Sequence, residues 1–296
     1  MVHKAEIRGL VAYPITPFDK DELDLVRLKE LVRELISNGS DAIAPLGSTG
    51  EAAYLSLAEW KAVVDATVEA TAGEVPVVVG SSDLTTSGTI ERVQYAQAAG
   101  ADAVMVAPIS YWALKEQEIF GHYASIGASI DIPVVAYNNP ATAGVDMSPE
   151  LLVRMFESIP NVTTVKESTG DVTRMNQMRE LTAGTLPFLN GSNPLILDAV
   201  EAGAVGWSTA AMCLLPQPIK ALYVAASSGD SARAKTLYEE LKPFLQFIVK
   251  QGLPSAIKTG LSQQGAPAGD PRLPLLPVGE EDERVLASML TLSYSL

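Results

Sequence analysis

One lysine lies where a buried strand is predicted to end. Residues 162–165 read VTTV, a β-branched run that favours a strand, and such an apolar strand is usually buried. Lys166 follows this run directly and is the only one of the eleven lysines on a predicted core strand. Because burying an ammonium group is costly, two readings remain open. The amine is a nucleophile, or it snorkels from the strand end to solvent.

Two other predicted strands end in groups that suit the same chemistry. The segment from Ala42 ends in GSTGE, where Ser48 and Thr49 offer hydroxyl and amide donors to a carboxylate. Tyr137 brings a phenol to the end of the segment PVVAYN. Each feature alone also fits a turn or a buried tyrosine. An amine, a phenol and an anion cradle together indicate Schiff-base chemistry on a 2-oxo acid.

The elements that must position these residues alternate along the chain. Eight short β-branched runs are separated by segments of helical period, with a possible capping box at Ser56 and Glu59 and an N-cap at Ser148. Glycines that suit helix C-caps are Gly39, Gly73, Gly100 and Gly203. The eight runs begin at Ile7, Ala42, Pro76, Ala103, Pro133, Val162, Pro187 and Ala204.

This alternation predicts an α/β fold with a parallel sheet, and eight units in about 250 residues favour a closed (β/α)8 TIM barrel. We expect residues 1–215 to hold the barrel strands and the site. Residues 216–296 would add the last barrel helix and a C-terminal helical extension to the same structural unit. Helices are expected at 231–251 and 281–290. Active sites of such barrels lie at the carboxyl ends of the strands.

Strand periodicity separates the neighbours of the lysine into two faces. Thr164, Lys166 and Ser168 are expected on one face, and Glu167 on the other. Glu167 is therefore not expected to pair with Lys166.

Composition excludes several classes of function. The 296 residues carry one cysteine, Cys213, and two histidines, so neither an internal disulfide nor a transition-metal cluster is expected. We expect no cofactor. The net charge of -14 argues against nucleic-acid and anionic-membrane partners. No apolar run is long enough for a membrane span or a signal peptide, so a cytoplasmic location is expected.

Four segments, GSTGEAAYLS, YNNPATAGV, VKESTGD and NGSNPLILDAVEAGAVG, carry a family resemblance. In order and spacing they resemble the dihydrodipicolinate synthase and N-acetylneuraminate lyase superfamily, from Thr16 to at least Met212. The resemblance implies a (β/α)8 barrel, usually a homotetramer and otherwise a homodimer. It also implies a lyase of the class I aldolase type that acts on pyruvate or a related 2-oxo acid and an aldehyde-type partner, without a metal.

The resemblance assigns roles to particular residues. Lys166 matches the Schiff-base lysine and Tyr137 the proton-relaying tyrosine, while Ser48 and Thr49 match the carboxylate-binding pair. Tyr111 resembles the tyrosine lent across a subunit interface, although PISYWAL carries one residue more than the usual spacing.

A chemical role follows for the central pair. A neutral Lys166 would attack the C2 carbonyl of the substrate, and the cationic imine would stabilise a carbanion or enamine at C3. Tyr137, held by a hydroxyl such as that of Ser48, would move protons to and from the intermediates.

The resemblance is weaker around the second substrate. Synthases of the family carry an arginine where this chain has Thr142, and that arginine binds the carboxylate of aspartate semialdehyde. Sialic acid lyases carry acidic residues where Ser192 and Asn193 stand. A neutral or hydroxylated partner is therefore expected. The family's backbone contacts to substrate map to Gly191 and Gly206. Candidates for the variable half of the site are Asn139, Thr142, Ser168, Asn193, Trp207 and Ser208.

Several alternatives stay open. The protein could be a true 4-hydroxy-tetrahydrodipicolinate synthase of lysine biosynthesis, or a dehydratase or deaminase of a 2-oxo sugar acid or a hydroxylated pyrroline carboxylate. A non-catalytic barrel that binds a 2-oxo acid would not require both Lys166 and Tyr137. A phosphate-handling barrel enzyme would need a more glycine-rich pattern than GSNP and GWSTAAM provide.

Overall fold

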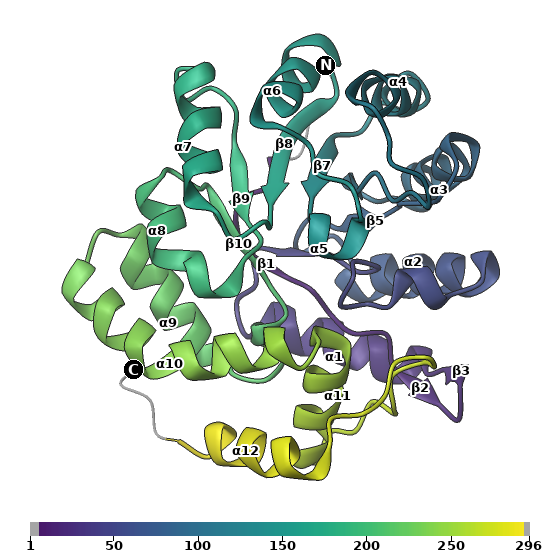
Figure 1. Cartoon of the computed structure of the whole chain (residues 1–296). Coiled ribbons are helices and arrows are strands. Elements are labelled where there is room, and N and C mark those ends of the chain that lie inside the picture. The colour runs from purple at the N-terminus through teal and green to yellow at the C-terminus, as the bar shows by residue number, and fades with distance from the viewer. Residues whose placement is uncertain (1–5, 293–296) are drawn as a thin grey trace. The chain divides into compact units, whose positions relative to one another are not determined.

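The structure is a computed structural model that describes residues 6–292. All eight predicted strands are present (Figure 1). They are β1 (Gly9–Ala12), β4 (Ala42–Ile43), β5 (Val78–Gly80), β6 (Ala103–Val106), β7 (Val134–Asn138), β8 (Val162–Glu167), β9 (Phe188–Asn190) and β10 (Gly206–Thr209). Two short strands that we did not predict, β2 (Phe18–Asp19) and β3 (Glu22–Leu23), form an antiparallel hairpin.

Helices fill the intervals between the strands. The first group is α1 (Leu25–Ser37), α2 (Leu57–Thr71), α3 (Thr86–Ala99), α4 (Glu116–Gly127), α5 (Pro140–Ala143), α6 (Pro149–Ser158), α7 (Val172–Leu181) and α8 (Ile196–Glu201). The remaining helices are α9 (Pro216–Ser227), α10 (Ser231–Lys250), α11 (Leu253–Gln263) and α12 (Glu280–Leu290). Single 3-10 turns lie at η1 (Ala52–Tyr54), η2 (Asn193–Leu195) and η3 (Ala211–Cys213).

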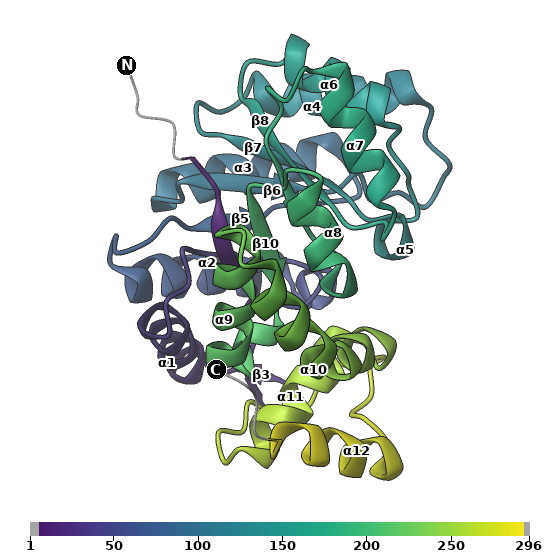
Figure 2. The ribbon, with the colours of Figure 1, turned by 90° about the vertical axis from the view of Figure 1, so that its left-hand side faces the viewer.

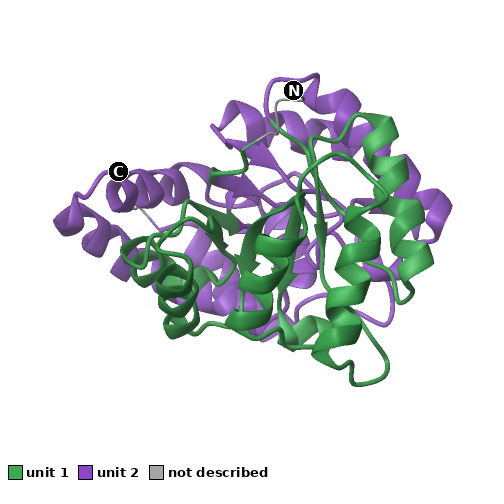
Figure 3. Cartoon of the chain, turned by 90° about the horizontal axis from the view of Figure 1, so that it is seen from above, with its two compact units in different colours: residues 1–9, 76–208 green, residues 10–75, 209–296 purple. Residues whose placement is uncertain are grey.

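The chain divides into two compact units, which Figure 3 distinguishes by colour. Unit 1 comprises residues 1–9 and 76–208, and unit 2 comprises residues 10–75 and 209–296. The predicted division at residue 215, between barrel strands and helical extension, stays a prediction.

Unit 1 contains a continuous parallel ladder from β5 to β10. Each strand pairs with the next one along the chain, and Tyr137 on β7 stands opposite Lys166 on β8. The strands are buried along almost their whole length, as expected of a parallel sheet covered by helices.

Unit 2 contains the pair β1–β4 and the C-terminal helices. Val11 stands opposite Ala42 in a parallel register. Helix α9 packs against α10, and α11 packs against α12 (Figures 1 and 2). The helices at 231–250 and 280–290 confirm two predictions, whereas α11 was not predicted.

The strand order identifies the fold class. The eight parallel strands follow the order β4-β1-β10-β9-β8-β7-β6-β5, with helices between them. This is a (β/α)8 TIM barrel with a C-terminal helical extension, as the alternation of strands and helices predicted.

The structure confirms predicted capping residues at helix starts and at a helix end. Ser56 and Glu59 form a complete capping box at the start of α2, and Ser148 caps α6 ahead of Pro149. Gly100 closes α3 in the left-handed conformation. These caps fix where each helix leaves the adjoining loop.

Candidate active site

Lys166 and Tyr137 form a buried pair near the ends of two adjacent strands. The Lys166 side chain is on β8, and the residue is 5% exposed. Its Nζ atom lies 4.0 Å from the centroid of the Tyr137 ring on β7. An ammonium group over an aromatic face is attracted by the ring quadrupole. The lysine therefore does not snorkel to solvent, and the structure brings the predicted amine and phenol into contact.

Gly191 adjoins this pair on the other side. A Cβ atom added there would lie 1.8 Å from Ser168 Oγ and 2.9 Å from Lys166 Cε. Its backbone nitrogen donates to the carbonyl of Glu167 at 2.8 Å. A side chain at residue 191 would therefore occupy the space of Ser168 and of the lysine. Ser168 and Lys166 lie on the same face, as strand alternation predicted.

The phenol of Tyr137 has a partner that we did not expect. The side-chain amide of Asn139 donates to the Tyr137 hydroxyl oxygen at 2.8 Å. The expected contact of the phenol with a hydroxyl such as that of Ser48 stays a prediction. Asn139 was proposed only as a lining residue, and the structure joins it to the tyrosine. A donor at this oxygen stabilises the phenolate that forms when the tyrosine gives up its proton.

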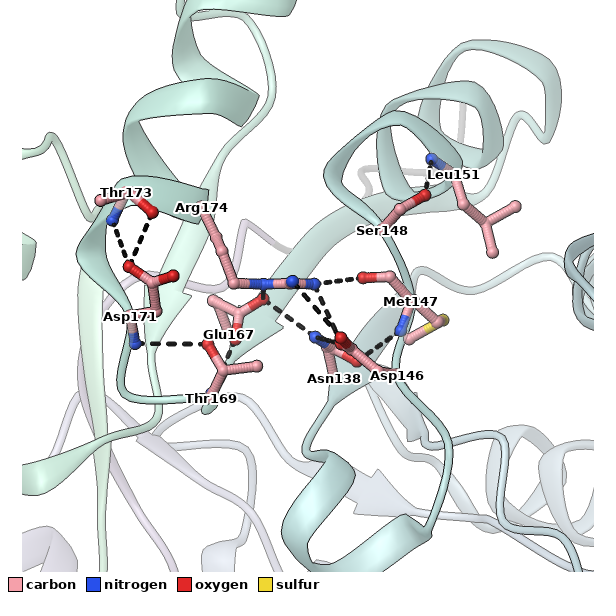
Figure 4. A network of polar contacts seen from close by, with 10 residues as sticks. All are labelled: Asn138, Asp146, Met147, Ser148, Leu151, Glu167, Thr169, Asp171, Thr173 and Arg174. Carbon is pink, nitrogen blue, oxygen red and sulfur yellow. Dashed lines mark hydrogen bonds and ion pairs between the residues drawn. The ribbon is translucent and has the colours of Figure 1, made fainter. Parts of the chain in front are cut away.

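A polar network joins the residues that follow Tyr137 and Lys166 in the chain, namely Asn138 and Glu167 (Figure 4). Glu167 is fully buried and accepts from the Asn138 amide at 3.1 Å and from the Thr169 backbone nitrogen at 2.7 Å. Arg174 on α7 reaches Glu167 at 3.4 Å and Asp146 at 3.0 Å. The Glu167 side chain thus lies on the opposite face of β8 from the Lys166 side chain, as predicted.

The same network ties the chain around the two strand ends. The Asn138 side-chain nitrogen also donates to Asp146 at 3.0 Å, and the Asn138 side-chain oxygen, Oδ1, accepts from the Met147 backbone nitrogen at 3.0 Å. Arg174 also donates to the Met147 carbonyl. Because Asn138 directly follows Tyr137 and Glu167 directly follows Lys166, the network helps to fix the direction in which both side chains leave their strands.

The GSTGE loop follows β4 in unit 2 and contains the predicted carboxylate cradle. Thr49 is buried, whereas Ser48 is exposed. Leu46 and Glu51 have positive φ angles of 61° and 55°. A Cβ atom at Gly50 would lie 2.9 Å from the Leu46 nitrogen, so only glycine fits this turn without a shift.

The proposed variable half contains buried polar atoms that are not satisfied by the described residues. Asn193 and Ser208 are buried, and no hydrogen bond reaches Asn193 Oδ1, Ser208 Oγ or Ser168 Oγ within residues 6–292. The same holds for Trp207 Nε1. A buried polar atom is normally paired, so these atoms are suited to a polar ligand.

Two other predicted site residues are exposed, and a third, Gly206, packs closely against backbone. Thr142 lies exposed on α5, and Tyr111 is 97% exposed in the loop before α4. At Gly206, an added Cβ would lie 2.5 Å from the Gly9 carbonyl oxygen, so packing already explains this glycine. A backbone contact from Gly206 to substrate stays a prediction.

Sequence reasoning missed the charged residues that support the site. Arg174 and Asp146 lie on a helix and a loop, where charged side chains are ordinarily solvated. Lys258 was assigned to a non-core segment, yet it is buried beside Glu51. The available signal for Lys258 was a lone charge near three apolar residues, Ala256, Ile257 and Leu261.

Two further properties of residues 6–292 bear on the class of site. No three His, Cys, Asp or Glu side chains in this range lie where they could hold a metal ion. No helix in the same range is long and apolar enough to cross a bilayer.

Fold and sequence together define the class of protein, a (β/α)8-barrel lyase of the class I aldolase type. The chain belongs to the dihydrodipicolinate synthetase family, whose model matches residues 6–292. This confirms the family resemblance in the sequence.

Relatives span the whole chain. It is 35% identical over 286 residues to the 4-hydroxy-tetrahydrodipicolinate synthase of Methanothrix thermoacetophila, covering 96% of each chain. It is 33% identical over 290 residues to the enzyme of that name from Thermomicrobium roseum, covering 98% of this chain and 96% of the relative.

Solved structures agree with this fold. A Pseudomonas aeruginosa protein, provisionally named a dihydrodipicolinate synthetase, superposes with a TM-score of 0.95 at 50% identity, covering 97% of this chain and 99% of that one. The 4-hydroxy-tetrahydrodipicolinate synthase of Methylacidiphilum fumariolicum SolV superposes with a TM-score of 0.93 at 30% identity, covering 97% and 95%.

Proposed function

We propose that the protein makes or breaks a carbon–carbon bond next to the carbonyl of pyruvate or a related 2-oxo acid, through a Schiff base on Lys166. The observation that carries this proposal is the buried contact of Lys166 Nζ with the Tyr137 ring at 4.0 Å. A non-catalytic barrel that binds a 2-oxo acid would have no need to bury an amine against a phenol.

The chemistry uses few groups. The neutral amine of Lys166 adds to C2 of the 2-oxo acid, and loss of water from the carbinolamine leaves an imine. A proton then leaves C3, and the resulting enamine attacks the carbonyl carbon of the second substrate. Hydrolysis of the imine frees the amine and the product, and the reverse sequence cleaves the same bond.

Proton transfer and binding of the substrate carboxylate are assigned to further residues. Tyr137 protonates the departing hydroxyl of the carbinolamine and recovers the proton at hydrolysis. The amide of Asn139, at 2.8 Å, stabilises the phenolate between these steps. Ser48 and Thr49 bind the substrate carboxylate through hydroxyl and backbone donors.

Intact-protein mass spectrometry after incubation with pyruvate and borohydride tests the proposal. The expected result is one reduced pyruvyl group per chain in the wild type and none in Lys166→Met. The matched control is Lys61→Met on α2, which should label like the wild type. Full labelling of Lys166→Met would disprove the assignment.

For the second substrate, we propose a neutral or hydroxylated carbonyl compound rather than aspartate semialdehyde. Thr142 stands where family synthases carry an arginine, and a hydroxyl cannot replace a bidentate guanidinium. The unsatisfied atoms of Ser168, Asn193 and Ser208 suit a hydroxylated ligand instead.

A substrate panel decides this point. Aldehydes with pyruvate are compared with aspartate semialdehyde, and 2-oxo sugar acids and hydroxylated pyrroline carboxylates are tested for cleavage, dehydration and deamination. Preference for a hydroxylated substrate is expected, with aspartate-semialdehyde turnover rising in Thr142→Arg. Strong wild-type preference for aspartate semialdehyde would favour the function named for the relatives.

We further propose that the protein acts in the cytoplasm as a homotetramer. The assembly rests on the family and on the exposed aromatic side chains considered below.

A further inference from the structure

The loop that contains Ser48 and Thr49 is held in a conformation that costs energy. Leu46 and Glu51 both occupy the left-handed region, which a side chain with a Cβ rarely adopts. The Thr16 hydroxyl donates to the Gly50 carbonyl at 2.7 Å and anchors one point of the turn. Such a turn persists only where its surroundings hold it.

Two of these surrounding contacts come from the C-terminal extension. Glu51 is fully buried, and its Oε1 lies 2.6 Å from Nζ of Lys258, which is itself buried on α11. The second carboxylate oxygen of Glu51 accepts from the backbone nitrogen of Arg272 at 2.7 Å. Both oxygens of the last residue of GSTGE are therefore held by the extension.

Lys258 is fixed by further contacts. Its Nζ donates to the Asp270 carbonyl at 3.0 Å and lies 4.2 Å from the centroid of the Phe18 ring. Burial lowers the pKa of Lys258, and the neighbouring Glu51 opposes this shift. A buried ion pair adds little net stability compared with apolar side chains, but it can specify one conformation.

Arg272 extends the same contact beyond the loop. Its guanidinium lies 2.7 Å from Asp21 and 2.8 Å from Glu59, and it donates to the Tyr54 carbonyl at 3.1 Å. Tyr54 ends the turn that directly follows GSTGE. The segment that contains Arg272 thus holds the loop at Glu51 and again three residues later.

We propose that Lys258 and Arg272 are positioning residues, through which the C-terminal extension sets the GSTGE loop to bind the carboxylate of the 2-oxo acid. This inference rests on the proposed function, which assigns the carboxylate to Ser48 and Thr49. The proposal predicts a different effect on two kinds of substrate. Loss of the Lys258–Glu51 pair impairs substrates with a carboxylate beside the carbonyl and spares those without one.

Borohydride trapping at Lys166 with two carbonyl compounds tests the selectivity. Pyruvate has the carboxylate, whereas acetaldehyde has a carbonyl alone. In Lys258→Met, the pyruvate concentration for half-maximal trapping should rise roughly 10- to 100-fold, the effect of a displaced binding group. Acetaldehyde trapping should stay within about two-fold of the wild type.

Two further variants distinguish loss of positioning from misfolding. Lys250→Met makes the same change at an exposed residue of α10 and should behave like the wild type. The double variant Glu51→Gln/Lys258→Met leaves no unpaired buried charge, and it should show the same selective loss. Unchanged pyruvate trapping in Lys258→Met, or an equal loss with both carbonyl compounds, would overturn the proposal.

Failure of the proposed function would look different. A wild type that forms no pyruvate adduct counts against Schiff-base chemistry itself. Amide hydrogen exchange of residues 47–51 then still tests the positioning contact. Faster exchange in Lys258→Met than in Lys250→Met supports it, and equal exchange contradicts it.

Discussion

At the scale of single residues, Lys166 is confined by the groups on either side of it. The centroid of the Tyr137 ring lies 4.0 Å from Lys166 Nζ. Gly191 has no side chain, and a Cβ atom added there would lie 2.9 Å from Lys166 Cε. Because Tyr137 lies on the adjacent strand β7 and Gly191 directly follows the adjacent strand β9, the amine has few conformations to lose on reaction. A preorganised nucleophile of this kind lowers the entropy cost of the bond-forming step.

Gly191→Ala should reduce the rate of adduct formation roughly 100-fold, because the new methyl group would lie 2.9 Å from Lys166 Cε and displace the amine. Single-turnover trapping with pyruvate measures this rate. The matched control is Gly121→Ala on α4, where an added Cβ meets nothing within 4 Å. A Gly191→Ala rate equal to that of the control would show that the glycine is not needed for the lysine.

Replacing Ser168 by glycine tests separately the two close contacts that an alanine at residue 191 would make. In Gly191→Ala/Ser168→Gly, the contact with Ser168 Oγ at 1.8 Å disappears, but the contact with Lys166 Cε remains. The rate should therefore recover only in part.

At the scale of elements, α7 supports β7 and β8 through Arg174. Its guanidinium joins the buried Glu167 to Asp146, and the Asn138 amide binds both carboxylates (Figure 4). The network therefore holds two strand ends, one loop and one helix together. Two of its members, Asn138 and Glu167, adjoin the reactive residues in the chain, so loss of the network should lower both stability and activity.

Arg174→Met should lower the free energy of unfolding by roughly 3 kcal/mol, because it leaves Glu167 charged and buried. Urea unfolding measures this change. Arg179→Met on the same helix is the control, since Arg179 makes a long hydrogen bond of 3.4 Å to the Ala202 carbonyl. Equal destabilisation by the two variants would contradict the role of the network.

Acid should weaken the contact between α2 and the extension. The hydrogen bond from Arg272 lowers the pKa of Glu59 from its ordinary 4.5 to about 2. A lowered folded-state pKa stabilises the fold above the ordinary value, and this contribution is lost as the pH falls from 4.5 toward 2.

Urea midpoints measured across that window should therefore fall more steeply for the wild type than for Glu59→Gln. Glu74→Gln, an exposed change just beyond α2, serves as the control and should follow the wild type. Parallel curves for the wild type and Glu59→Gln would show that Arg272 does not stabilise the ionised carboxylate.

The strands could be predicted from sequence because their β-branched runs are local signals. The contact of the amine with the phenol followed from their places at neighbouring strand ends, whereas the carboxylate cradle stays a prediction. Helix α11 was missed because its segment, GLPSAIKTGLSQQG, reads as a loop rich in glycine and serine. Inside that helix, Gly260 faces Leu214 so closely that an added Cβ would lie 2.6 Å from it.

Contacts between distant residues were beyond sequence reasoning. Glu51 and Lys258 are separated by about two hundred residues, and nothing local marks them as partners. Asn139 was proposed as a lining residue, but its bond to Tyr137 depends on the backbone direction after β7.

At the scale of the whole molecule, exposed aromatic side chains indicate an interaction surface. Tyr111 is 97% exposed and its neighbour Trp112 is 78% exposed. Large apolar side chains grouped on a surface mark contacts between proteins. Together with the resemblance of Tyr111 to the interface tyrosine of the family, this supports assembly through the loop that contains them.

Light scattering should give a particle of about 125 kDa, four times the chain mass of 31.3 kDa. Tyr111→Ala/Trp112→Ala should lower that mass, whereas Val26→Ala, at another exposed apolar residue, should not. A wild-type mass near that of a single chain would contradict the tetramer, and an unchanged mass in the double variant would place the aromatics outside the interface.

The most direct measurement of the central claim is the location of the reduced adduct. Peptide mapping after treatment with pyruvate and borohydride should find the pyruvyl group on Lys166 and on none of the other ten lysines. A pyruvate-dependent adduct on another lysine, with Lys166 unmodified, would contradict the assignment of the nucleophile and the mechanism built on it.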